Sequence, residues 1–248
     1  MQNQSLALIP FAFPNLPQVC CCFTTAIFGN ISLDVCADDE KERSMTISRR
    51  FALAGLTGFS RWTELRQVHG EAVLADVKAT PLDEPSTLEA DGLASSKSGH
   101  ALLVKVADCQ PILLAHRSGR RIAALHCGWR GSSFDFPGRG LAAFCRFYDL
   151  KPEDVLAVRG PSLGPGAAEF INFDQEWPDN FRPWFNPESR LMDLWSLTRH
   201  QLLQAGMLPE HIFSLDLCTY ALGGDGGCLF SFRRGDALRQ GALIFIRP

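Results

Sequence analysis

The chain has 248 residues, of which 46% are hydrophobic, and its formal net charge is −3 at pH 7. It is long enough to bury a large core, and we expect residues 1–248 to form one α/β domain. The small negative charge gives no reason to expect nucleic acid or an anionic membrane surface as a partner. No apolar run approaches the roughly eighteen residues of a membrane span, so none is predicted.

The N-terminal region and the cysteines together predict a cytoplasmic location. The first forty residues contain neither lysine nor arginine, and the apolar run at 19–23 is too short for a secretion signal. The nine cysteines are odd in number, and Cys20, Cys21 and Cys22 are adjacent, which argues against a disulfide framework. We expect a reduced protein in which these three cysteines lie in a buried strand.

Two long helices are predicted. The first covers residues 38–56, with acidic residues at its start and Gly55 near its end. Ile47, Phe51 and Ala54 have helical spacing and are predicted to form its apolar face. The second lies between residues 191 and 205, where apolar side chains recur at helical spacing before a stop at glycine.

Strands are predicted at 102–107, 154–159, 212–217 and 243–247. The apolar runs 111–116 and 121–126 flank a short polar segment that contains glycine, which indicates a β-hairpin. The stretch 170–187 contains three prolines and two tryptophans. We expect it to be a long surface excursion that could cover the functional site.

Two histidines and a cysteine stand in three short segments that point to chemistry. These are RQVHG at 66–70, ADCQP at 107–111 and LHCGWRG at 125–131. A thiolate with two imidazoles suits zinc, and three protein ligands leave a fourth position open for water or substrate, as in catalytic sites. We therefore expect a catalytic metal centre at His69, Cys109 and His126.

The hairpin supports half of this centre without any knowledge of the fold. If residues 118 and 119 form the turn, His126 lies opposite Pro111, and Cys109 is its diagonal neighbour on the same face, at roughly 7–8 Å between backbones. Cys127 then points to the opposite face. His69 must be delivered by tertiary structure.

Six segments of the chain resemble, in order, the motifs of the YfiH-like laccase-domain family. Each motif is weak alone, but six in order over about residues 30–246 are specific. They are RQVHG at 66–70, ADG at 90–92, ADC at 107–109, HCGWRG at 126–131, GPS at 160–162 and SFRR at 231–234. One segment departs from the family pattern, since residues 30–34 read NISLD where a loop of SLNLG type is expected.

The resemblance implies a layered fold of mixed α+β type, with mixed sheets flanked by helices. It also implies one metal ion, zinc with copper as the alternative, held by His69, Cys109 and His126. The implied activity is that of a purine nucleoside phosphorylase that also deaminates adenosine. Its expected substrates are small molecules, namely phosphate with adenosine, inosine, guanosine or methylthioadenosine.

Phosphate would be held by arginine, because the guanidinium group matches phosphate oxygens bidentately. The candidates are Arg130, Arg233 and Arg234. Asn30 and Gln67 are expected to contact substrate.

Asp91 is expected to transfer a proton or to orient a histidine of the metal centre. Asp108 precedes Cys109 in the strand, so its side chain is expected to point away from the site.

Three other functions use the same residues and stay open. A cysteine hydrolase would use Cys109 as nucleophile with His126 or His69 as base. A copper-dependent polyphenol oxidase needs several ligands beyond one blue copper site, a demand that the six histidines meet poorly. A metal-binding protein without turnover is the alternative outside enzymology.

Overall fold

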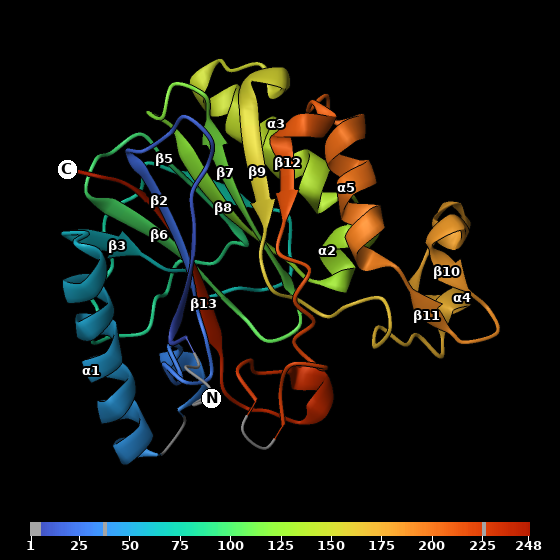
Figure 1. Ribbon diagram of the computed structural model, residues 1–248, viewed down its shortest axis with the longest axis horizontal. Coiled ribbons are helices and arrows are strands. Elements are labelled where there is room, and N and C mark those ends of the chain that lie inside the picture. The colour runs from blue at the N-terminus through green and yellow to red at the C-terminus, as the bar shows by residue number, and fades with distance from the viewer. Residues whose placement is uncertain (1–5, 37–38, 225–226) are drawn as a thin grey trace, which may run out of the picture.

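The computed structural model describes residues 6–36, 39–224 and 227–248, and these form two β-sheets packed face to face with helices on both outer faces (Figure 1). The first sheet has five strands in the order β1-β2-β13-β6-β3. They are β1 (Leu8–Phe11), β2 (Val19–Thr24), β13 (Gln240–Ile246), β6 (His100–Val106) and β3 (Arg61–Thr63).

The second sheet has six strands in the order β12-β9-β7-β8-β5-β4. They are β12 (Ile212–Ser214), β9 (Val155–Arg159), β7 (Gln110–His116), β8 (Ile122–Cys127), β5 (Gly92–Ser95) and β4 (Val73–Ala75). Both sheets are mixed, because edge strands β3, β12 and β4 pair in parallel with neighbours in otherwise antiparallel sheets. The predicted fold class of mixed sheets flanked by helices is confirmed.

The space between the sheets is filled by the inward-facing side chains of alternate strand positions. Leu102 and Val104 of β6 face Leu113 of β7 and Ala124 of β8 in one buried cluster. Because side chains alternate along a strand, the intervening positions build two further cores on the outer faces. This alternation decides which side chains reach the interior at the strand ends.

The outer faces are covered by helices. Helix α1 (Glu40–Thr57) lies over the first sheet, and α3 (Phe136–Tyr148) and α5 (Leu194–Gln204) lie over the second (Figure 1). A short helix, α2 (Trp129–Ser133), follows β8 directly. The 3-10 helices are η1 (Leu33–Val35), η2 (Pro152–Asp154), η3 (Asp179–Trp184), η4 (Pro209–His211) and η5 (Phe232–Arg234).

The predicted apolar face of α1 is wrong at Phe51, whereas Ala54 is half-buried against the core. Phe51 is 54% exposed, whereas Leu53 is fully buried together with Arg50 and Thr46. The cause is the buried guanidinium of Arg50, which donates to Glu64 at 2.9 Å and to the Ile31 carbonyl at 2.9 Å. A charged residue on the buried face conceals that face from a search for apolar spacing.

The ends of α1 also differ from the prediction. The helix begins at Glu40, where the side chain of Asp39 accepts a hydrogen bond from the Glu42 amide, and the predicted start at residue 38 lies outside the described residues. It passes through Gly55 and ends at Thr57, where Gly58 caps it with a left-handed φ of 84° that suits glycine.

The other predicted elements are confirmed within a few residues. Strands lie at β6, β7, β8, β9 and β13, and Cys20 to Cys22 lie in β2. Strand β12 is shorter than predicted, ending at Ser214, and α5 starts at Leu194 because Leu191 belongs to the two-residue strand β11 (Leu191–Met192). All nine cysteines are free thiols. Within the described ranges, no helix has the length and apolar character to cross a membrane.

The segment predicted as a surface excursion is a small folded unit that projects from the body (Figure 1). It contains α4 (Phe173–Glu176), η3, β10 (Phe185–Asn186) and β11, and its aromatic side chains pack on one another around Trp177. Of residues 170–187, only Phe170 lines the main cavity. The segment therefore walls one side of the site and does not cover it.

The corrected face of α1 gives a stability prediction. Leu53→Ala should lower the free energy of unfolding by about 2–5 kcal/mol, because Leu53 packs against Trp62 and Ile31 in a closed core. Phe51→Ala, the matched control on the same helix, should change it by less than about 0.5 kcal/mol. Chemical denaturation followed by circular dichroism measures both, and equal losses would contradict the assigned face.

Candidate metal centre

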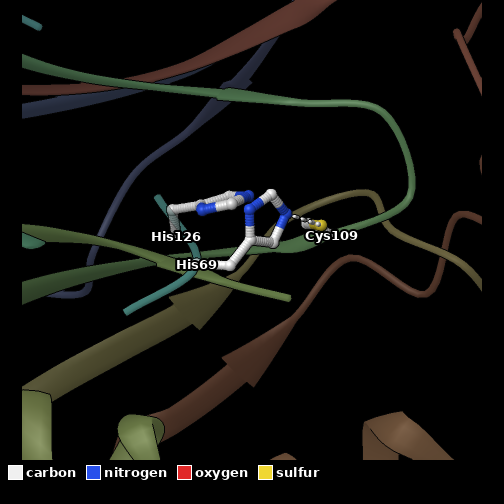
Figure 2. Close-up of side chains that lie close together, drawn as sticks. All are labelled: His69, Cys109 and His126. Atoms are coloured by element: carbon white, nitrogen blue, oxygen red, sulfur yellow. Dashed lines mark hydrogen bonds between the residues drawn. The ribbon is translucent and has the colours of Figure 1, made fainter. Parts of the chain in front are cut away.

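His69, Cys109 and His126 meet at one end of the layer between the two sheets (Figure 2). Their candidate ligand atoms all lie within 4.8 Å of one another, and Cys109 Sγ is 3.8 Å from His69 Nε2. The two imidazole rings are 4.9 Å apart between centroids, at 77° to each other. The fold thus brings His69 next to Cys109, which lies forty residues further along the chain.

The local geometry of Cys109 and His126 follows from the hairpin register. Pro111 pairs with His126, as predicted, and Cys109 stands just before β7 on the same side of the sheet. Cys127 faces the opposite side, in the core beneath α3. The alternation of side chains along β8 therefore separates the two neighbouring residues, as the sequence predicted.

The loop that carries His69 is held by the carboxylate of Asp91, which lies directly before β5. Asp91 accepts hydrogen bonds from the backbone amides of Val68 at 3.2 Å, His69 at 3.0 Å and Gly70 at 2.7 Å. These contacts stabilise a left-handed backbone at His69, whose φ is 58°. The same carboxylate bonds His126 Nδ1 at 2.8 Å. One acidic side chain thus orients both histidines.

The absence of a side chain at Gly128 is required by this packing. A Cβ placed there would lie 2.8 Å from His69 Cδ2 and 3.2 Å from Cys109 Sγ. Gly128 directly follows β8, so the chain turns into α2 against the face of the cluster. Any larger residue would push His69 away from Cys109.

The electrostatics of the cluster favour an ion pair between the Cys109 thiolate and the His126 imidazolium, and a bound metal would take the place of the proton on His126. Burial alone would raise the pKa of the Cys109 thiol, but the charge of His126 and hydrogen bonds from both histidines lower this pKa to about 6. Burial alone would lower the pKa of His126, but the Cys109 thiolate and the Asp91 carboxylate raise it to about 9. Burial opposes ionisation of Asp91 as well, and its bonds with His126 and the loop amides bring the net pKa below the usual value.

The donor set fits a transition metal of borderline softness. A thiolate is the form of cysteine that ligates metal, and its lowered pKa makes it available at neutral pH. Since His126 Nδ1 is engaged by Asp91, Nε2 is left as its ligand atom, in the carboxylate–histidine arrangement common around bound metals. His69 and Cys109 face a cavity, so a fourth position would be accessible to a small molecule.

The cavity beside the cluster has a volume of about 1000 Å³ and is lined by all three residues. Its walls carry more cationic than anionic side chains; these are Arg66, Lys105, Arg130, Arg233 and Arg239 against Asp34 and Asp108. Arg66 is paired with Glu89, and Lys105 with Asp34 and Glu64. No carboxylate of the described residues pairs with Arg130, Arg233 or Arg239. Arg233 and Arg239 do donate to backbone carbonyls, but the positive charge of all three guanidinium groups is not neutralised by an acid, which favours an anionic ligand.

Comparison with known proteins identifies the family. Residues 22–247 match the family described as multi-copper polyphenol oxidoreductase laccase. The chain belongs to this family. It is 32% identical to purine nucleoside phosphorylase YfiH of Escherichia coli K12, with 89% of this chain and 92% of the relative covered. It is 31% identical to purine nucleoside phosphorylase PA4543 of Pseudomonas aeruginosa, with 95% and 96% covered.

Solved structures of the family show the same fold. The crystal structure of YlmD from Geobacillus stearothermophilus superimposes with a TM-score of 0.80 at 24% identity, covering 100% of this chain and 98% of that one. The structure of YfiH from Bacillus licheniformis also gives 0.80, at 22% identity and 96% coverage of both chains. At these identities the likeness concerns the fold.

Three arginines were expected to bind phosphate. Arg130 and Arg233 line the cavity, and Arg234 does not. Arg130 is exposed and stacks on Trp129, with 4.5 Å between its guanidinium carbon and the ring centroid. Arg233 is exposed and donates to the Glu169 carbonyl at 2.9 Å. Arg234 donates to the carbonyls of Thr219, Tyr220 and Leu229 and pairs with Asp236. Its guanidinium is used in folding the loop.

The two amide residues expected to contact substrate are used by the fold. The side chain of Gln67 lines the cavity, but it donates to the Lys105 carbonyl and accepts from the Lys105 amide, at 2.8 and 2.7 Å. Asn30 is fully buried, bonds both backbone groups of Ser32 and accepts from the Arg239 amide. Asn30 lies outside the cavity lining, so the structure gives it a role in shaping the loop.

The sequence did not single out four charged residues of the cavity lining as site residues, namely Asp34, Arg66, Lys105 and Arg239. Lys105 carried a readable signal, because it is the only charged residue in an otherwise apolar strand. Asp34 and Arg239 lie in the cavity wall because of where their loops fold, and no local sequence pattern predicts this position. The expectation that Asp108 points away from the site is wrong, because Asp108 lines the cavity and accepts hydrogen bonds there from Thr219 Oγ1 and the Arg233 amide, both at 2.6 Å.

The cluster predicts how metal content responds to substitution. The purified protein should carry about one transition metal ion per chain, and Cys109→Ser should remove most of it, because a serine hydroxyl is not ionised at neutral pH. Cys228→Ser is the control, since this thiol lies outside the cluster. Elemental analysis of the three proteins measures the effect. Wild-type metal content in Cys109→Ser would exclude Cys109 as a ligand.

Proposed function

We propose that this protein is a metal-dependent purine nucleoside phosphorylase that cleaves adenosine, inosine, guanosine and methylthioadenosine with phosphate and also deaminates adenosine. The observation that carries the proposal is an open cluster of three donors on the wall of a large cavity that also presents unpaired guanidinium groups. Phosphorolysis needs an anion site beside a site for the nucleoside, and the cationic lining and the volume of this cavity support that reading. The names of the relatives supply the substrate class.

His69, Cys109 and His126 would hold zinc, with copper as the alternative. When bound, the ion would supply Lewis acidity next to the substrate. Asp91 is then a positioning residue, because its oxygens accept from His126 and from three loop amides and it does not line the cavity. Its proposed task is to keep the two imidazoles oriented.

The phosphate would be held by Arg130 and Arg233. In the reaction a phosphate oxygen forms a bond to the anomeric carbon of ribose while the bond from that carbon to the purine nitrogen breaks. The developing charge moves onto the base, and the cations keep the dianion aligned for attack. Stacking on Trp129 restricts the Arg130 guanidinium before phosphate arrives, so less conformational entropy is lost on binding.

A cysteine hydrolase is the second candidate, and one observation favours it. Cys109 Sγ lies 3.8 Å from His69 Nε2, so His69 is placed to act as a base. The pKa of Cys109 is lowered to about 6 and that of His126 is raised to about 9, so His126 would hold a proton beside the thiolate at neutral pH. The same thiolate suits a metal ligand, so metal content separates the two functions.

Multi-copper oxidase chemistry is supported least. An oxygen-reducing cluster needs several histidines beyond a first copper site. His100 bonds Thr63, His116 bonds Ser118 in the hairpin turn, and His200 stacks on Trp184. Within the part of the chain that the structure describes, one group of three or more candidate metal ligands is found.

The decisive experiment follows the products of inosine. With phosphate, the purified protein should release hypoxanthine and ribose 1-phosphate, and omission of phosphate should reduce the rate to background. Liquid chromatography of the products measures both arms. Free ribose formed at the same rate in water alone would identify a hydrolase and exclude phosphorolysis.

Arg130→Ala should raise the apparent KM for phosphate by about tenfold or more while changing that for inosine by less than about twofold, since a charge-assisted hydrogen bond contributes about 1.5–3 kcal/mol. Arg146→Ala is the matched control, because Arg146 is exposed on α3 and does not line the cavity. Initial rates at varied phosphate give the constants. An equal rise in both constants would remove Arg130 from the phosphate site.

A further inference from the structure

We propose that the Asp34 carboxylate accepts a hydrogen bond from a ribose hydroxyl, 2′ or 3′, of the substrate and so selects nucleosides that carry this hydroxyl over analogues that lack it. This inference rests on the proposed nucleoside activity and concerns the same cavity. It assigns the specificity to a residue in η1, on the wall formed by residues 32–35.

Asp34 stands at the end of a buried chain of charges. Arg50 Nη2 donates to Glu64 Oε2 at 2.9 Å, and Lys105 Nζ lies 3.0 Å from the same oxygen. Lys105 also pairs with Asp34 Oδ2. Arg50, Glu64 and Lys105 are almost fully buried, whereas the Asp34 side chain is 35% exposed. Asp34 is therefore the member of the chain that a ligand can reach.

The loop before Asp34 is rigidly placed. Arg50 Nε donates to the Ile31 carbonyl at 2.9 Å, and the Asn30 amide bonds both backbone groups of Ser32. Ile31, Ser32 and Leu33 are buried, and Asp34 is the first residue of this run to emerge. A carboxylate held in this way is already oriented for its ligand, which lowers the entropic cost of binding.

One oxygen of Asp34 is left to accept from a ligand. Oδ2 takes both the Lys105 contact and a hydrogen bond from Ser32 Oγ at 3.4 Å. No donor among the described residues bonds Oδ1, and the residue lines the cavity. An ionised carboxylate is a pure acceptor, so its ligand must be a donor.

The charge balance favours hydroxyl groups over a cation as that donor. Arg50 and Lys105 together balance Glu64 and Asp34, so the chain of four has no net negative charge to attract a cation. Arg239, without a carboxylate partner among the described residues, lies in the same cavity wall and adds to this bias. Ribose hydroxyls are neutral donors, and an acidic side chain is a common acceptor for them in nucleotide-binding sites.

The test measures binding of three nucleosides to the purified protein by isothermal titration calorimetry, in the absence of phosphate. Wild type should bind inosine about tenfold or more tightly than 2′-deoxyinosine or 3′-deoxyinosine, whichever lacks the contacted hydroxyl. Asp34→Asn should weaken inosine to the level of that analogue and leave the analogue unchanged. Asp154→Asn is the control, because Asp154 pairs with Arg117 at the surface and lies outside the cavity lining.

Equal binding of all three nucleosides to wild type would overturn the inference, as would an equal loss for all three in Asp34→Asn. Asp34→Ser is a second variant, and thermal melting reports whether each variant folds. If neither folds, the wild-type comparison decides. Selective inosine binding without phosphorolysis would refute the proposed reaction and keep the role of Asp34. No inosine binding to wild type would refute both.

Discussion

The geometry of the site depends on the carboxylate of Asp91. It accepts from three successive amides around His69 and from Nδ1 of His126, so a loop after β3 and the end of β8 are fixed to one point. Without this acceptor, the amides would lack a partner and the left-handed backbone at His69 would lose its support. The close packing of Gly128 against the ring of His69 also depends on this carboxylate, because Asp91 fixes the position of His69.

Charge is distributed unevenly around the cavity, and the division has a chemical meaning. On one wall, Arg50, Glu64, Lys105 and Asp34 neutralise one another. Burying such groups is costly unless each is paired, which makes the arrangement a constraint on shape more than a source of stability. On the other wall, Arg130 is held against Trp129 with no acid to neutralise it. A substrate with a neutral, hydroxyl-rich part and an anionic partner matches this division.

The family's description refers to several coppers and laccase activity, whereas its curated relatives are named purine nucleoside phosphorylases. The ligand geometry does not match the several coppers of the first description within the described residues. One cluster of two histidines and a cysteine is a single site, and the other histidines lie apart, at the start of β6, at the hairpin turn, in α5 and in η4. The copper-oxidase interpretation and the nucleoside-phosphorylase interpretation both rest on the same thiol and two imidazoles.

The sequence by itself determined what depends on neighbouring residues. The alternation of the β7–β8 hairpin placed Cys109 and His126 on one face and Cys127 on the other, because side chains of a strand alternate whatever the surrounding fold. Tertiary structure decided the rest. His69 reaches the site because its loop is bonded to Asp91. Arg234 is held in its own loop by Asp236 and by carbonyls such as that of Thr219. Phe51 is exposed because Arg50, bound to Glu64, takes the buried face of α1. A buried charge is stable only with such a partner, and local spacing carries no record of it.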